Sequence, residues 1–132
     1  MMKELSAFDI AGRAMSAQLV RLNTIASNLA NAETVSGTEA GAYRAMKPVF
    51  ATQYAGATAT VNVTGIVHTG TPERQHQPDH PLADADGNVW AAGVDPNQEL
   101  VEMVETARQY ANTVEVLSTA KTLALDTLRL GR

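Results

Sequence analysis

The chain of 132 residues contains no cysteine, few aromatic residues and no long apolar run. The absence of cysteine excludes disulfides, thiolate metal ligands and a cysteine nucleophile. Lysine and arginine occur singly in a chain of net charge −4, so no basic stripe is available to neutralise phosphates. We therefore expect neither a nucleic-acid nor an anionic-membrane partner. Asp9 and Arg13 interrupt the N-terminal segment, so we expect no cleaved secretory signal and no membrane-spanning helix.

Apolar and small residues near the N-terminus recur at alternating steps of three and four. This spacing predicts a heptad seam on one amphipathic helix of roughly 25 residues. Gln18 is the polar break in the seam, and we expect it and Asn28 to face water or a partner. The helix is predicted to stop between Asn31 and Gly37, where helix propensity falls. The seam comprises Phe8, Ala11, Met15, Gln18, Leu22, Ile25 and Leu29.

The last quarter of the chain predicts a second helix of roughly 35 residues. Asp95 is placed as its N-cap and Pro96 at its first position, with Gln98 completing a capping box. Gly131 is expected to end this helix. Its seam again steps by three and four, through Leu100, Met103, Ala107, Tyr110, Val114, Leu117, Lys121, Ala124 and Leu128.

The segment between the helices has a different pattern. Residues 60–64 alternate with period two, and Val49-Phe50 and Ile66-Val67 are β-prone. Residues 56–59 are expected to form a flexible loop tip, and prolines interrupt the later connections. The segment is therefore predicted to be a small β-rich insert.

These patterns predict an α+β fold in which long N- and C-terminal helices pair as an antiparallel-type coiled coil around a small β-rich insert. Residues 1–34 and 95–132 form the helical part, and residues 35–94 form the insert. Neither seam can bury its apolar face alone, so the helices must pair. Two interpretations of the seams stay open, intramolecular core and intermolecular interface. Assembly through the terminal helices is the function that this layout favours.

No motif favours catalysis or a cofactor. His76 and His80 have helical spacing for a metal pair, but Pro78 and Pro81 exclude a helix there, so we expect a surface loop. Residues 84–88 resemble the start of a calcium loop without its closing glutamate and predict a β-turn instead. The serines occupy no recognisable nucleophile motif. An intracellular helical adaptor and a small metal-dependent enzyme that uses the two histidines remain as alternatives.

The run Ala26-Ser27-Asn28-Leu29-Ala30-Asn31-Ala32-Glu33-Thr34 resembles the N-terminal signature of bacterial flagellar rod and hook proteins. Further segments resemble the same family over nearly the whole chain. They are residues 9–12, 43–45 and 80–87, and in the closing helix residues 99–104, Arg108, Tyr110, 114–117 and 119–121.

The resemblance implies a structural subunit of the flagellar basal-body proximal rod, without enzymatic activity or cofactor. Such a subunit is exported by the flagellar type III apparatus without a cleaved signal, and it transmits torque within the rod across the periplasm. Its terminal helices form a coiled-coil layer that lines a central channel, with the β insert outside. The implied partners are further copies of the chain, the proximal-rod proteins FlgB and FlgF, the distal-rod protein FlgG and the adaptor FliE, which joins the rod to the MS ring.

The seams and the resemblance together predict where assembly contacts lie. Small seam residues permit close backbone approach between helices. Asn28 and Asn31 are expected to form hydrogen bonds across helix ends or to neighbours. The predicted apolar contacts are Leu22, Ile25, Leu29, Leu100, Met103, Tyr110, Val114 and Leu117.

Overall fold

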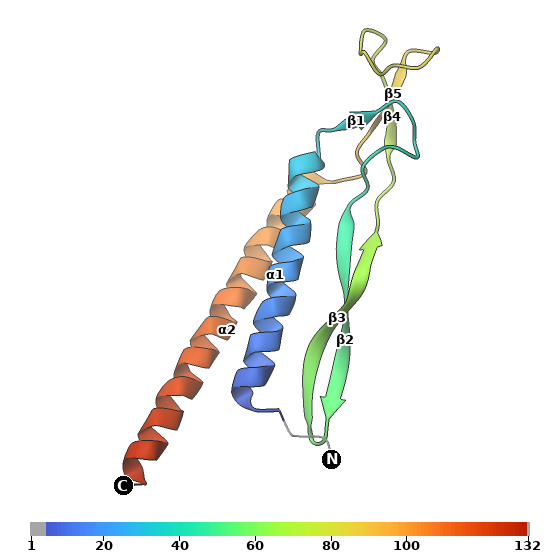
Figure 1. Ribbon diagram of the computed structural model, residues 1–132. Helices are drawn as coiled ribbons and strands as arrows, with labels where there is room; N and C mark the ends of the chain where they lie inside the picture. Colours follow the sequence, from blue (N-terminus) through green and yellow to red (C-terminus); the bar gives the residue numbers. More distant parts are fainter. Residues whose placement is uncertain (1–4, 132) are drawn as a thin grey trace.

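Two long helices and a β-rich middle segment make up the computed structural model, which describes residues 5–131 (Figure 1). This confirms the predicted α+β class. Residues 1–4 and 132, which the sequence assigns to the helical part, lie outside the described range. In chain order the elements are α1 (Ala7–Asn31), β1 (Val35–Ser36), β2 (Met46–Ala55), β3 (Thr58–His68), β4 (Glu73–His76), β5 (Asn88–Ala91) and α2 (Pro96–Leu130).

Both helices have the predicted lengths, 25 residues for α1 and 35 for α2. Asp95 is the N-cap of α2 as predicted, and its carboxylate accepts from the backbone of Asn97 and Gln98. The predicted capping box is only half formed: the Gln98 N–H donates to Asp95, but no bond from the Asp95 N–H to the Gln98 side chain is found among the described residues. A capping box is found at α1, where the side chains of Ser6 and Asp9 each accept from the other's backbone N–H.

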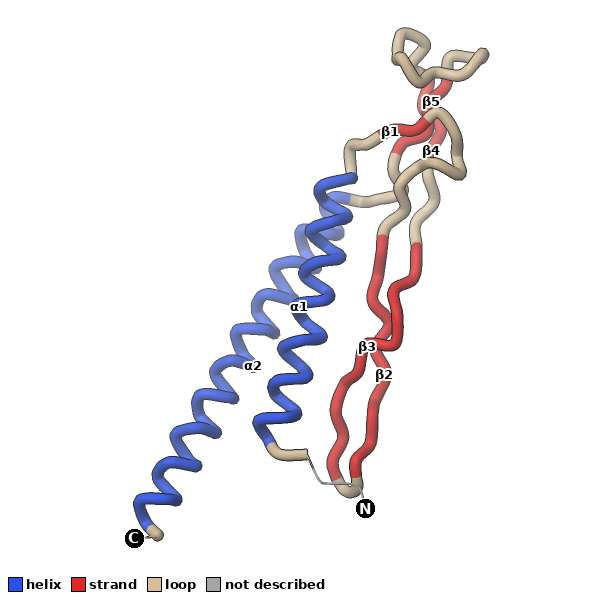
Figure 2. The backbone as a smooth tube through the Cα atoms, in the orientation of Figure 1, coloured by secondary structure: helices blue, strands red, loops and turns tan. Residues whose placement is uncertain are grey.

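The helices run antiparallel and lie side by side, with the β2–β3 hairpin along the other side of α1 (Figures 1 and 2). Helix α1 is therefore the middle layer of three. Helix α2 is the longer of the two, and its C-terminal part extends past the start of α1 (Figure 1). One face of the helix pair is thus covered within the chain, while the outer face of α2 is not.

The hairpin is longer than the sequence predicts. Its turn is only two residues, and Thr58 and Ala59, expected in a loop, belong to β3. Gly56 has φ of 62° while Ala57 does not adopt a positive φ, which is the pattern of a type II′ turn. A register shift between Val49 and Phe50 marks a bulge in the pairing.

A three-stranded sheet of order β1-β5-β4 lies beyond the ends of the helices (Figure 1). Its outer loop contains the predicted turn, in which Gly87 donates to the Asp84 carbonyl. The Asp84 carboxylate accepts from the backbone of Asp86 and Asn88, which leaves it occupied by the turn itself. The backbone of Gly93, just before α2, bonds to Tyr43 and Ala45, just before β2, so the approach to α2 is tied to the start of the hairpin.

The buried core is thin and built from small side chains, as the scarcity of aromatic residues predicts. On α1 the buried residues are Ala11, Ala17, Thr24, Ile25 and Asn28. On α2 they are only Glu99 and Thr106. Small side chains bring the helix backbones close but bury little apolar area, so much of the apolar surface is left for other contacts.

Candidate assembly surface

The contact between the helices is partly polar. Gln18 of α1 donates its amide to Gln109 of α2 at 2.9 Å, and the Gln18 oxygen is buried without a hydrogen-bond partner among the described residues. The prediction that Gln18 faces water or an external partner is therefore wrong. A buried polar pair fixes the register of a helix pair at some cost in stability. This polar pair therefore favours one register of the two helices and adds little apolar burial.

Helix α2 buries a different line of residues than the predicted seam. Glu99 and Thr106 are buried, and Thr113, seven residues further on, is half-buried. Each lies one position before a predicted seam residue, so the contact face is rotated away from the apolar stripe. These three residues have heptad spacing in the sequence, but a search for apolar periodicity misses them because they are polar.

This rotation splits the predicted contacts of α2 into two groups. Met103, Tyr110 and Leu117 are half-buried at the edge of the helix contact. Leu100 and Val114 are 50% and 41% exposed. The structure thus leaves two of the five predicted contacts on α2 uncovered.

Exposed apolar side chains occur over the first turns of α2 and again over its C-terminal half. Leu128, in the part that passes the start of α1, is 69% exposed. A large exposed apolar surface on one element is typical of an interaction site. Its members are Leu100, Val101, Val104, Val114, Val116, Leu123, Leu125, Leu128 and Leu130, of which the sequence analysis singled out three.

The predicted contacts of α1 lie within the single chain. Ile25 is buried and Leu22 and Leu29 are half-buried, on a helix that contacts both α2 and the hairpin. Because α1 is the middle layer, its side chains pack against neighbours on two sides. Only a small part of each of these side chains is therefore available for contact with another subunit.

Asn28 is occupied inside the chain. Its amide donates to the Met46 carbonyl at 3.0 Å, and its oxygen accepts from the Met46 N–H at 2.8 Å and the Tyr43 hydroxyl at 2.9 Å. The Ser27 hydroxyl lies 3.0 Å from that of Tyr43. Asn28 is only 1% exposed, so the expectation that it faces water or a partner is wrong. It joins the end of α1 to the start of the hairpin.

Asn31 also forms a local hydrogen bond. Its amide donates to the Ser27 carbonyl one turn earlier, at 2.8 Å. The side chain is half-buried near the last turn of α1. The bond lies within the helix and does not bridge two helix ends.

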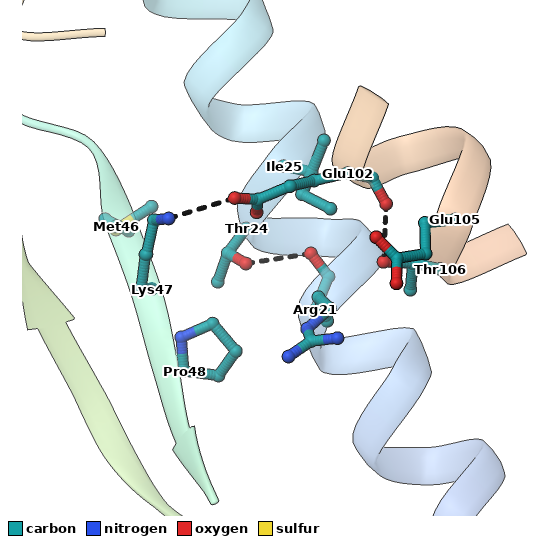
Figure 3. A pocket seen from close by; sticks show the side chains of 9 residues that line it. All are labelled: Arg21, Thr24, Ile25, Met46, Lys47, Pro48, Glu102, Glu105 and Thr106. Carbon is teal, nitrogen blue, oxygen red and sulfur yellow. Dashed lines mark hydrogen bonds and ion pairs between the residues drawn. The ribbon is translucent and has the colours of Figure 1, made fainter. Parts of the chain in front are cut away.

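A cleft of about 290 Å³ lies where α1, β2 and α2 meet (Figure 3). Lys47 of β2 reaches across it to Glu102 of α2, with 3.0 Å between Nζ and Oε1. Arg21 lies lower on its α1 wall and also stacks on Phe50, 5.1 Å from the ring centre. These contacts join the hairpin to both helices.

The candidate metal residues are engaged in local structure. His76 lies on β4 with Nδ1 3.2 Å from the Asn88 side chain, and His80 Nδ1 accepts from the Leu82 N–H. Within residues 5–131, no group of three histidine or acidic side chains is placed to hold a metal ion. Neither described helix combines the length and apolar character needed to cross a membrane.

This geometry defines a class of protein, an elongated chain with two paired terminal helices and exposed apolar side chains on α2. The family described as "Flagella basal body rod protein" matches residues 8–37, and the one described as "Flagellar basal body rod FlgEFG protein C-terminal" matches residues 85–130. The two matches cover α1 and α2, the elements with the seams.

Full-length relatives narrow the assignment. The flagellar basal-body rod protein FlgC of Yersinia enterocolitica is 46% identical and aligns over 99% of this chain and 100% of its own length. That of Salmonella typhimurium is 44% identical over 97% and 98%. That of Aquifex aeolicus is 32% identical over 92% of each chain. The chain belongs to the FlgC family of flagellar basal-body rod proteins, and it is a structural rod subunit rather than an enzyme.

Proposed function

We propose that this chain builds the proximal part of the rod by packing its terminal helices against those of neighbouring subunits. The observation that carries the proposal is the uncovered apolar surface of α2, from Leu100 to Leu130. The hairpin already covers the opposite side of α1. Neighbouring subunits would therefore pack on α2, with residues 1–34 and 95–132 in the axial layer and residues 35–94 outside it.

Among the predicted contact residues, we assign the main intermolecular role to Leu100 and Val114, whose side chains are exposed in the single chain. Met103, Tyr110 and Leu117 border the same surface. We assign Leu22, Ile25, Leu29, Asn28 and Asn31 chiefly to holding the helix pair and the hairpin in place, so that the outer face is presented correctly.

The same proposal gives the layers a mechanical role. Lys47 bonds to Glu102 across the cleft, and Arg13 of α1 donates to Gln53 of β2 at 3.1 Å. A torque applied to the axial layer then moves the outer β part with it. Stiffness of this kind suits transmission of motor torque.

Family membership supports a set of partners and a location. We propose contacts with further copies of this chain and with FlgB, FlgF, FlgG and FliE, in a rod that crosses the periplasm. We also propose export by the flagellar type III apparatus without cleavage of a signal peptide. These follow from the family and not from any contact in the single chain.

The test is to tag the chain and purify intact basal bodies from a flagellated host that carries it. We expect the tag in the rod, and loss of motility when the gene is deleted. A chain that is abundant in the cytosol and absent from basal bodies would instead favour the intracellular helical adaptor. A tagged cytosolic protein of known location, absent from the preparation, controls for contamination.

A further inference from the structure

A second cavity, of about 600 Å³, lies beside the first turn of α2. Lys47 at the base of the hairpin lines one part, and Thr69 to Thr71 and Gly93 line others. Three acidic residues, Glu73, Asp95 and Glu99, also line it. Its wall therefore has more acidic than basic side chains.

Glu99 is the unusual member of this wall. It is only 3% exposed, and its Oε2 atom has no hydrogen-bond partner among the described residues. A buried carboxylate without a partner is costly, because it has lost water without gaining a replacement. Among residues 5–131, no group pairs with this Oε2 atom.

The nearby charges do not supply that group. The Lys47 ammonium, which also borders this cavity, lies 3.0 Å from Glu102, and Arg44 Nε donates to the Gly70 carbonyl at 3.1 Å. The Asp95 carboxylate caps α2 through two backbone N–H groups. No three acidic or histidine side chains within residues 5–131 are placed for a metal ion, so a metal is not the natural occupant.

We propose that this cavity is a socket for a lysine or arginine side chain presented by a neighbouring rod subunit, which pairs with Glu99 on assembly. The inference rests on the proposed function and adds a specificity element to it. An incoming cation meets a wall lined by three acidic residues and one lysine, Lys47, whose ammonium is already paired with Glu102. A subunit without the cation would leave Glu99 buried and unpaired, so the socket discriminates between neighbours.

The test compares Glu99→Gln with Glu115→Gln, a matched change at an exposed position of α2. Each tagged variant replaces the chain in a flagellated host, and its amount in purified basal bodies is measured. We expect a roughly tenfold or greater loss for Glu99→Gln and none for Glu115→Gln, because the neighbour's cation would be buried without its partner. The melting temperature of the free Glu99→Gln chain should be unchanged or higher.

The outcomes separate the two proposals. If the unaltered chain and Glu115→Gln are both absent from basal bodies, the proposed function is wrong. If both are present and Glu99→Gln is incorporated equally well, the socket is wrong. A lower melting temperature of the free Glu99→Gln chain would show that Glu99 has a partner within its own chain, which also overturns the socket.

Discussion

The side chain of Asn28 and the backbone of Met46 form two reciprocal hydrogen bonds, at 3.0 and 2.8 Å. An asparagine amide can mimic a backbone peptide group, with one donor and one acceptor side by side. Asn28 therefore extends the hydrogen bonding of β2 onto the end of α1. This places the hairpin against the helix at one fixed point.

Replacing Asn28 by alanine should lower the free energy of unfolding of the free chain by about 2–4 kcal/mol, because buried groups of Met46 and Tyr43 lose their partners. Urea denaturation followed by circular dichroism measures this. Asn23→Ala, at an exposed position of the same helix, is the control and should change stability by less than about 0.5 kcal/mol. Equal effects of the two changes would contradict the role given to Asn28.

The Gln18–Gln109 pair should cost stability relative to an apolar contact. Replacing both residues by leucine should raise the free energy of unfolding by about 1 kcal/mol, because the unpartnered Gln18 oxygen is removed. Replacing Gln109 alone by alanine should lower it by about 1–2 kcal/mol, since the Gln18 amide then loses its acceptor. A double-mutant cycle in urea gives the coupling, and a destabilised double variant would argue against this account.

Leu100→Asp tests the outer face of α2 without disturbing the helix pair. The side chain is already 50% exposed, so the stability of the free chain should change by only about 0.5 kcal/mol. Assembly should fail, because the charge would be buried against a neighbour without a partner. Swimming in soft agar and rod content report assembly. As a control, Asn97→Asp adds the same charge at an exposed polar position nearby, and cells that carry it should remain motile. Normal motility of cells that carry Leu100→Asp would contradict the proposed interface.

Replacement by alanine should change the free energy of unfolding in opposite directions at two glycines. Gly70 has φ of 77°, and a Cβ there would collide with the Gly93 carbonyl. Gly70→Ala should therefore lower the free energy of unfolding by about 2 kcal/mol or more. Gly12 lies in α1 with open space around it, so Gly12→Ala should raise the same quantity by about 0.5–1 kcal/mol. Thermal and urea unfolding check both, and a neutral Gly70→Ala would contradict the close approach.

The helices could be predicted from sequence because their signals are local. Asp95 marks the start of α2 by accepting bonds from the next backbone N–H groups, Pro96 suits the first helical position, and the apolar period marks the length of the helix. The hairpin was only partly predicted. Residues 60–64 alternate clearly, but Thr58 and Ala59 join β3 only because the tight turn at Gly56 and Ala57 sets the register.

The sequence by itself therefore determined the helix positions, the α+β class, the small-residue core and the family. The tertiary structure decided which face of each helix is covered. Polar Thr106 faces α1 and Glu99 is buried beside the first turn of α2, while Leu100 is half exposed, because the contact between two helices depends on how the small side chains of both fit together. It also decided that Asn28 is held inside the chain, because its partner Met46 becomes adjacent only when the hairpin folds back along α1.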